Sequence, residues 1–313
     1  MPRELLYSQR MSAMLGRFAP GASEALRLAV RAQHIRRWTI PRDTYPKTPE
    51  GYQQWRRELM RFHAQTAGAL AEEKETWKGP FGGTFSAGMT IASDYSYRGI
   101  SQTQRSFAFQ PTFTYETPSF SEAVPVSAYG GFWASNVNFG PTTGTAAEID
   151  VLAGFRAKAL KDKMTVDLGY IRYSYLGSNP GLFYDFNEFG LVVGYDFDVV
   201  QLSGALRYSP NFFANSGNAW YKWAQLAVPL SFIKVNDNVS FKLFGTVGTQ
   251  YVERNLNYGI PNNNYWDWQV GLTASVYGFD LTAAYTGTNI SVQDCGGTQN
   301  CASRVIFSIS KAF

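Results

Sequence analysis

From Phe81 to the C-terminus, apolar and more polar residues alternate with a period of two, and this pattern constrains the fold more than any other feature of the chain. In the stretch FSAGMTIASDY, for example, Phe85, Ala87, Met89 and Ile91 occupy every second position. Alternate side chains of a β-strand point to opposite faces, so each such run predicts a strand with one apolar face. Similar runs recur to the end of the chain and predict about 12 strands, an even number typical of bacterial outer-membrane barrels.

The connections between these runs also alternate. Long polar segments such as SYRGISQTQRS and SVQDCGGTQNCA are interleaved with short ones such as LKDK, DV, KVNDN and YG. An antiparallel barrel whose two rims face different compartments produces this alternation, with the long loops outside the cell. No apolar run reaches the roughly 18 residues of a membrane-spanning helix. The sequence therefore predicts a mainly β protein, an antiparallel up-and-down transmembrane β-barrel preceded by a short α-helical N-terminal segment.

Aromatic residues gather near the ends of the predicted strands and suit the girdle of a barrel at the membrane interface. They are Tyr95, Tyr97, Tyr173, Tyr175, Trp220, Trp266 and Trp268. The last ten residues, RVIFSISKAF, place Val305, Phe307 and Ile309 on one strand face and end on Phe313. This ending resembles the C-terminal signature by which outer-membrane barrels are recognised for assembly, which implies the barrel-assembly machinery and outer-membrane lipid as partners.

The polar faces of the predicted strands carry charges of both signs. The pattern alone does not tell the inner face from the outer one, because the apolar face of a soluble sandwich or barrel would pack inward. The aromatic strand ends, the strand lengths and the closing phenylalanine favour a membrane barrel, in which we expect these charges to line the lumen.

The lumen-lining candidates are Asp150, Arg156, Lys158, Asp167, Glu188, Asp196, Arg207, Lys242, Asp280 and Arg304. These charges either filter small solutes in a narrow polar lumen or pair with one another and fill it. About 12 strands lie between the ~8 that side chains can fill and the ~16 that leave an open channel, and we expect a narrow or partly plugged pore.

Composition changes near Lys78. Residues 1–78 hold 14 Lys plus Arg against 8 Asp plus Glu, a net charge of +6, and both histidines; the remainder has a net charge of −2. Residues 22–38 have the spacing of an amphipathic helix. A second helix is expected from Pro49, with Thr48 as its N-cap, to about Glu73. We therefore predict a helical segment over residues 1–78, an incomplete domain, and a barrel over 79–313.

The side chains that usually carry catalysis or bind metals are scarce. His34 and His63 belong to no recognised ligand pattern, so no metal or cofactor is expected. The known outer-membrane hydrolases depend on histidine as general base, and the barrel region has none. Arginine pairs in the helical segment indicate solvated helix faces rather than a nucleic-acid interface. These observations favour a non-enzymatic barrel.

The two cysteines, Cys295 and Cys301, bracket a short polar loop. This spacing lacks the paired ligands of a zinc site and predicts a disulfide formed in an oxidising compartment. The alternative is two free surface thiols.

Four segments resemble the TorF family of bacterial porins: GMTIASDYSYRGISQT at Gly88–Thr103, GGFWASNVNF at Gly130–Phe139, EIDVLAGFR at Glu148–Arg156 and RYSPNFF at Arg207–Phe213. With the closing strand, the resemblance extends over residues 83–313. It implies an outer-membrane barrel that passes small solutes, without naming the solute.

Residues 3–71 resemble the N-terminal part of an unrelated bacterial helical domain of unknown function, through ELLYSQRMSAML, the stretch from ASEALRL to QQWRREL, and RFHA. The first 20 residues lack the apolar core of a signal peptide. A gene fusion, or a start codon placed upstream of a truncated signal-bearing gene, would explain both observations. We expect an outer-membrane location from the barrel; the alternatives are a structural barrel with a closed lumen and a non-exported fusion product without transport function.

Overall fold

The computed structural model describes residues 3–18, 39–71, 79–121, 125–236 and 238–313. The chain divides into two compact units, Met1–Thr76 and Trp77–Phe313.

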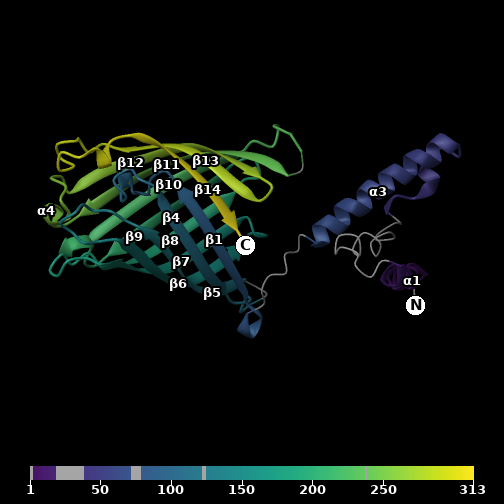
Figure 1. The fold of residues 1–313 in the computed structure, drawn as a ribbon, viewed down its shortest axis with the longest axis horizontal. Coiled ribbons are helices and arrows are strands. Elements are labelled where there is room, and N and C mark those ends of the chain that lie inside the picture. The colour runs from purple at the N-terminus through teal and green to yellow at the C-terminus, as the bar shows by residue number, and fades with distance from the viewer. Residues whose placement is uncertain (1–2, 19–38, 72–78, 122–124, 237) are drawn as a thin grey trace. The chain divides into compact units, whose positions relative to one another are not determined.

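The second unit is a closed antiparallel barrel of 12 strands, in which each strand pairs with its sequence neighbours and β1 pairs with β14 (Figure 1). The strands are β1 (Thr84–Ala92), β4 (Ala108–Glu116), β5 (Val126–Asn136), β6 (Ala147–Ala159), β7 (Met164–Leu176), β8 (Phe186–Asp196), β9 (Gln201–Ser209), β10 (Ala219–Pro229), β11 (Val239–Val252), β12 (Asn264–Val276), β13 (Phe279–Thr288) and β14 (Arg304–Ala312). The prediction of an up-and-down barrel with about 12 strands is confirmed.

The two rims of the barrel differ in their connections. One rim, the loop end, carries the connections 93–107, 137–146, 177–185, 210–218, 253–263 and 289–303. The other rim, the turn end, carries 117–125, 160–163, 197–200, 230–238 and 277–278, together with the start of β1 and the end of β14. The expected alternation is present for most connections. At the turn end, however, 117–125 and the KVNDN-containing 230–238 are as long as 177–185 and 210–218 at the loop end.

Several short elements lie in the connections of the second unit. The loop-end elements are β2 (Ser96–Tyr97), β3 (Ile100–Ser101), η4 (Phe213–Asn215), α4 (Asn255–Tyr258) and η5 (Gln299–Cys301). A further short element, η3 (Pro80–Gly82), precedes β1.

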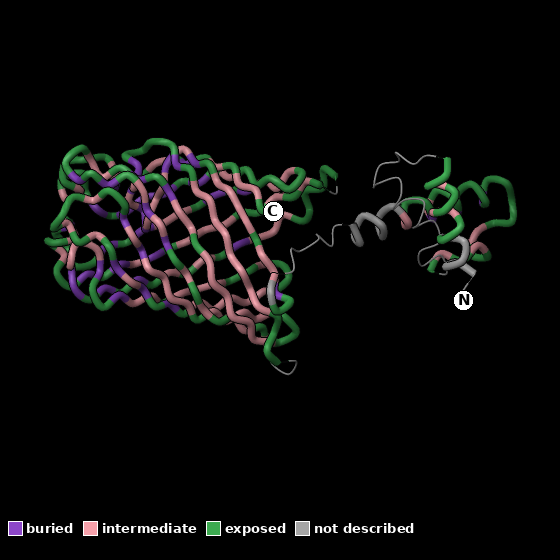
Figure 2. Tube along the Cα trace, turned by 60° about the horizontal axis from the view of Figure 1, so that its bottom comes forward, coloured by how far each residue is buried: buried purple, intermediate pink, exposed green. Residues whose placement is uncertain are grey.

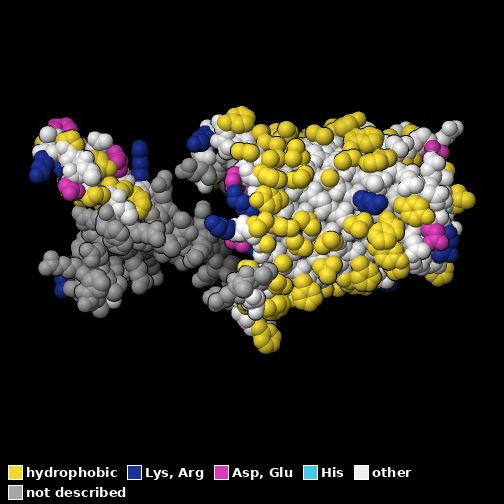
Figure 3. Space-filling view, turned by 180° about the vertical axis from the view of Figure 1, so that it is seen from behind, with side chains coloured by type: hydrophobic (Ala, Val, Ile, Leu, Met, Phe, Trp, Pro, Cys, Tyr) yellow, Lys and Arg dark blue, Asp and Glu magenta, His cyan; other side chains and the backbone are white. Residues whose placement is uncertain are grey.

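The outer wall of the barrel is apolar. Phe155, Leu168 and Leu191 are direct neighbours across three adjacent strands, and each is more than 40% exposed. Figure 3 shows apolar side chains over most of the barrel wall on one face, with charged groups mainly toward the ends. Val305, Phe307 and Ile309 of β14 belong to this exposed face. Among the described residues, no helix has the length and apolarity required to cross a membrane.

Burial is concentrated at the loop end, in the half of the barrel away from the C-terminus (Figure 2). A cluster of buried aromatic and apolar residues, including Tyr173, Phe186 and Phe212, occupies this half, and Tyr95 and Tyr97 pack against it. The prediction that Tyr173 and Tyr175 form part of an outer girdle was wrong, because both are buried within this cluster. Tyr95 and Tyr97 likewise pack inside.

The outer wall does carry exposed tryptophans near the loop end. Trp220 is 38% exposed and Trp266 is 51% exposed. Strand ends can therefore direct aromatic rings to either face, and only the position within the two-residue repeat decides which.

The first unit contains α1 (Arg3–Phe18), η2 (Arg42–Thr44) and α3 (Pro49–Ala71). The backbone N–H of Gly51 donates to Thr48 Oγ1 at 3.1 Å, so Thr48 caps α3 as predicted. The helix expected over residues 22–38, which contains His34, lies outside the described residues.

Candidate functional site in the barrel lumen

The first loop-end connection folds into the barrel. Its strands β2 and β3 pair as a hairpin, with Arg98 and Gly99 as the two turn residues. Both have positive φ, 49° and 82°, as the tight type I′ hairpin turn requires. A Cβ atom added at Gly99 would lie 2.3 Å from Thr288 Cγ2 of β13, so the tip of the hairpin contacts the barrel wall. This hairpin, residues 96–101, is called the lumen hairpin.

Arg98 at the tip of the lumen hairpin joins it to strands β8 and β11. Its Nη2 donates to Glu188 Oε1 at 2.5 Å and to Oε2 at 2.7 Å, and its Nη1 donates to Gln250. The guanidinium lies 4.1 Å from the ring centre of Tyr221 on β10. The side chains of Arg98 and Glu188 are only 4% and 1% exposed. The charge pair therefore lies buried in the loop-end half of the barrel interior.

The pKa of Arg98 reflects this setting. Burial alone would lower it, but the neighbouring Glu188 carboxylate outweighs burial and holds the pKa of Arg98 well above its usual value. The tip of the hairpin therefore keeps its positive charge.

The base of the hairpin is held by a second buried charge pair. Asp94 accepts hydrogen bonds from Ser101 Oγ at 2.6 Å and Thr103 Oγ1 at 2.8 Å. Arg304 of β14 pairs with the same carboxylate and also donates to the Gly99 carbonyl oxygen at 3.0 Å. Arg304, predicted as a lumen charge, thus fastens the connection that folds into the barrel.

Two further candidates are buried beside this connection. Glu148 and Asp150 of β6 are 0% and 7% exposed. Tyr95 OH donates to Glu148 Oε1 at 3.1 Å. Together with Glu188 and Gln250, they place polar groups in the loop-end half of the lumen without leaving them to solvent.

Toward the turn end, residues of β4 to β9 line a cavity of about 470 Å³ in the barrel interior, called the turn-end cavity. Arg156 donates to Glu116 Oε2 at 2.8 Å and to Asp167 Oδ2 at 3.1 Å. Tyr129 OH also donates to Asp167, at 2.7 Å, and Arg207 lies on the same wall. Arg156 and Glu116 are each 37% exposed, so this charge network faces solvent.

The remaining candidates lie close to the turn end and do not join either network. Asp196 accepts from Gln201 Nε2 at 3.1 Å, and Asp280 accepts from Ser275 Oγ at 2.5 Å. Lys158 and Lys242 are exposed near the ends of β6 and β11.

Sequence reasoning missed the buried residues that hold this connection inside the barrel: Arg98, Asp94 and Gln250. The signal for the hairpin was the pair Arg98–Gly99 between Tyr97 and Ile100, since glycine in the second turn position favours a two-residue hairpin. In the sequence, this pair lies within a long polar connection. The pair itself does not indicate that the hairpin would fold into the barrel.

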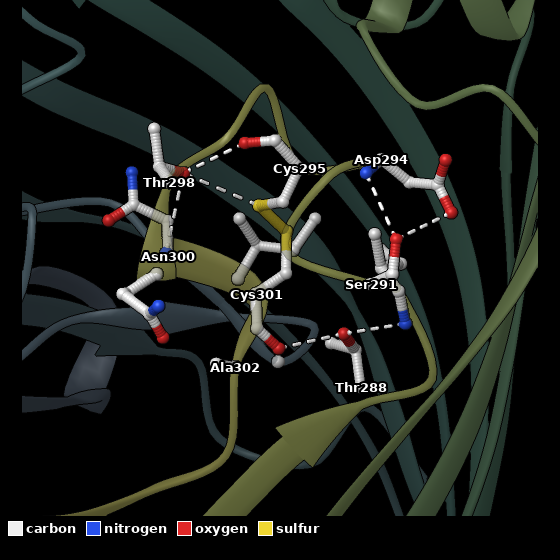
Figure 4. Close-up of a disulfide and its surroundings, with 12 residues drawn as sticks. Thr288, Ser291, Asp294, Cys295, Thr298, Asn300, Cys301 and Ala302 are labelled. Atoms are coloured by element: carbon white, nitrogen blue, oxygen red, sulfur yellow. Dashed lines mark hydrogen bonds between the residues drawn. A yellow bond between two sulfur atoms is a disulfide. The ribbon is translucent and has the colours of Figure 1, made fainter.

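Cys295 and Cys301 form a disulfide in the last loop-end connection (Figure 4). Thr288 Oγ1 donates to the carbonyl oxygen of Cys301 at 2.9 Å, and Cys301 is fully buried. The disulfide therefore closes a loop within this connection, and the hydrogen bond from Thr288 fastens that loop to the end of β13.

Comparison with known proteins divides the chain at the same place. Residues 1–78 match a domain of unknown function (DUF4202). No curated protein matches the chain.

Similar solved structures include the NanC porin, with 11% identity and a TM-score of 0.43 over 72% of this chain and 98% of that chain. The KdgM porin has 9% identity and a TM-score of 0.40 over 73% and 99%. LpxR from Salmonella typhimurium has 10% identity and a TM-score of 0.39 over 73% and 99%. Residues 75–313, the larger part of the chain, match a family described as bacterial protein of unknown function (Gcw_chp), and the chain belongs to this family.

Proposed function

We propose that this protein is a non-enzymatic outer-membrane channel of the porin type, which passes small solutes passively through a narrow polar lumen. One observation carries the proposal: the turn-end cavity is lined by charged groups, and the buried Arg98–Glu188 pair of the lumen hairpin lies in the loop-end half of the same barrel. The barrel wall leaves room for a path, and the hairpin closes it. The structure then corresponds to a closed state of the channel.

Other observations support this function. The outer wall exposes a belt of apolar residues suited to lipid, and the inward face carries charges of both signs. The resemblance of residues 83–313 to the TorF family of porins points the same way. The barrel also lacks the histidine on which known barrel hydrolases depend.

Planar-bilayer recording tests the proposal. Replacing residues 96–101 with a short glycine linker should convert rare, small current steps of the wild-type protein into a steady ion current. A matched control replaces residues 255–260, which include α4 at the same rim, and should keep the wild-type behaviour. If the hairpin variant assembles and carries no current, the channel function is wrong.

A structural barrel with a closed lumen is the second candidate. It is favoured by the burial of Glu148, Glu188 and Gln250, which place polar side chains in the loop-end half of the lumen. The same recording separates the two functions, because a barrel closed by its own wall stays silent without the hairpin.

The location and assembly partners follow from the same proposal. Phe313 continues the β1–β14 pairing, with its backbone N–H donating to the Ala87 carbonyl oxygen at 2.8 Å. We infer that Val305, Phe307, Ile309 and Phe313 are read by the barrel-assembly machinery. Deleting Phe313 should lower the yield of heat-modifiable barrel in the outer-membrane fraction, and an unchanged yield would contradict this role. Fractionation of the unaltered chain would also expose a non-exported product, which would have no transport function.

A further inference from the structure

The loop end holds a second cavity, separate from the turn-end cavity and lying on the outer side of the lumen hairpin. Its volume is about 280 Å³. Every long connection of the loop end contributes to its lining. One residue from each is Gln102, Asn138, Tyr184, Phe213, Tyr258 and Asn300. We propose that this cavity, called the mouth pocket, binds a small neutral molecule that has a flat apolar face and hydroxyl or amide groups at its edge.

The walls of the mouth pocket are aromatic rings held by one another. Tyr184 and Phe213 stack with their ring centres 4.2 Å apart and an angle of 12° between their planes. Phe139 meets Phe213 edge-on at 5.7 Å, and Tyr258 lies 5.2 Å from Phe212. Rings fixed in this way present flat surfaces without losing further side-chain freedom when a ring-shaped molecule binds.

The polar groups of the pocket determine the charge of its ligand. None of the described residues that line it is Asp, Glu, Lys, Arg or His. Amide side chains are present at Gln102, Asn138 and Asn300, and a hydroxyl group at Thr298; the hydroxyl group of Ser101 already donates to Asp94. A charged molecule would lose hydration here without finding an opposite charge, whereas a neutral molecule with hydroxyl groups would find hydrogen-bond partners.

Two features hold the pocket in shape. Its floor includes Tyr97, Ile100 and Ser101 of the lumen hairpin, which the Arg98–Glu188 pair fastens from below. One wall includes Cys295 and Cys301, which the disulfide joins. A pocket whose floor and wall are cross-linked is preformed, as small-molecule sites usually are. Binding at this pocket does not depend on whether the barrel conducts, so it stands apart from the proposed channel function.

Calorimetric titration of the full chain, refolded in detergent, with phenyl β-glucopyranoside tests the proposal. This neutral probe combines a flat ring with hydroxyl groups, and we expect a Kd of about 0.1 mM. Phenyl β-glucuronide, which has the same ring and a carboxylate, should bind about tenfold more weakly or worse. Tyr184→Ala and Phe213→Ala should each weaken binding of the neutral probe about tenfold.

Controls keep the test decisive. Tyr184→Phe retains the ring and should retain the affinity, and Tyr285→Ala removes an exposed ring of the outer wall and should leave binding unchanged. Heat-modifiability shows whether each variant has refolded. Tyr184→Phe still tests the pocket if an alanine variant does not refold. Equal binding of the glucuronide, unchanged affinity in the folded alanine variants, or no heat of binding with the neutral probe up to about 10 mM would overturn the assignment.

Discussion

The two halves of the barrel interior are built from the same strands and differ in almost every physical property. At the loop end, the Arg98–Glu188 pair is buried, with side chains 4% and 1% exposed. At the turn end, Arg156 pairs with Glu116 at 2.8 Å, yet both side chains are 37% exposed beside an open cavity. The strand pattern is alike in both halves. The difference arises because a loop-end connection enters the lumen, and no turn-end connection contributes residues to the turn-end cavity within the described part of the chain.

This difference has an energetic consequence. A buried charge that loses its partner remains in a poorly solvated site, whereas an exposed one is rehydrated and screened. The same chemical pair should therefore tolerate disruption very differently in the two halves.

The largest loss of stability is expected when the buried charge pair at the loop end is disrupted. Arg98→Ala leaves Glu188 buried without its cation and should lower the free energy of unfolding in urea by about 3–5 kcal/mol. The matched change Arg156→Ala, in the turn-end cavity, should lower it by less than about 1 kcal/mol. Adding Glu188→Ala to Arg98→Ala should recover most of the loss, since no unpaired charge remains. Similar losses for the two single variants would show that the halves do not differ as described.

A second test compares the inside of the wall with its outside. Val193→Arg places a charge on the apolar outer face and should cost about 2–4 kcal/mol near the bilayer midplane. Val192→Arg, one residue earlier, points into the turn-end cavity and should cost less than about 1 kcal/mol. Unfolding and refolding in lipid vesicles measures both. If Val192→Arg proves the more harmful, the assignment of the two faces is reversed.

A third prediction concerns the stability that the disulfide adds at the loop end. Closing the short loop between Cys295 and Cys301 should contribute about 2 kcal/mol, which the double variant Cys295→Ser/Cys301→Ser should lose in the same urea titration. In exported protein, the thiols should react with maleimide only after reduction. Rapid maleimide labelling of the cysteines without a reductant would show that the disulfide is absent.

The smallest effect is expected from the first unit. Removing residues 1–76 should change the unfolding free energy of the barrel by less than about 0.5 kcal/mol. Substitutions outside a packed core usually have effects of this size. The measurement compares the full chain with residues 77–313, both refolded in detergent and judged by heat-modifiability. Failure of the shorter chain to fold would show that the helical unit belongs to the folding of the barrel.

The sequence predicted the barrel well because its signals are local. The two-residue repeat indicates where the strands lie, about how many there are and which side chains share a face. The Thr48 cap follows from the residues beside Pro49. The lumen charges were harder to interpret. Glu188 and Arg156 have the same inward position in the repeat, but the repeat does not indicate whether a loop will bury one and leave the other hydrated.

Alternation along the chain thus determined by itself that residues 79–313 form strands with one apolar and one polar face, since side-chain direction in a strand depends only on local backbone geometry. Loop lengths and the closing strand were needed to predict a membrane barrel with the polar face inside. Tertiary structure alone decided that Arg98 crosses the lumen to Glu188 and Gln250, and that Tyr173 and Tyr175 face inward beside Tyr95 and Tyr97. Arg98 and Glu188 are 90 residues apart in the sequence. Their contact depends on barrel closure and on the path of a connection through it, and neither is encoded by the pattern of any single strand.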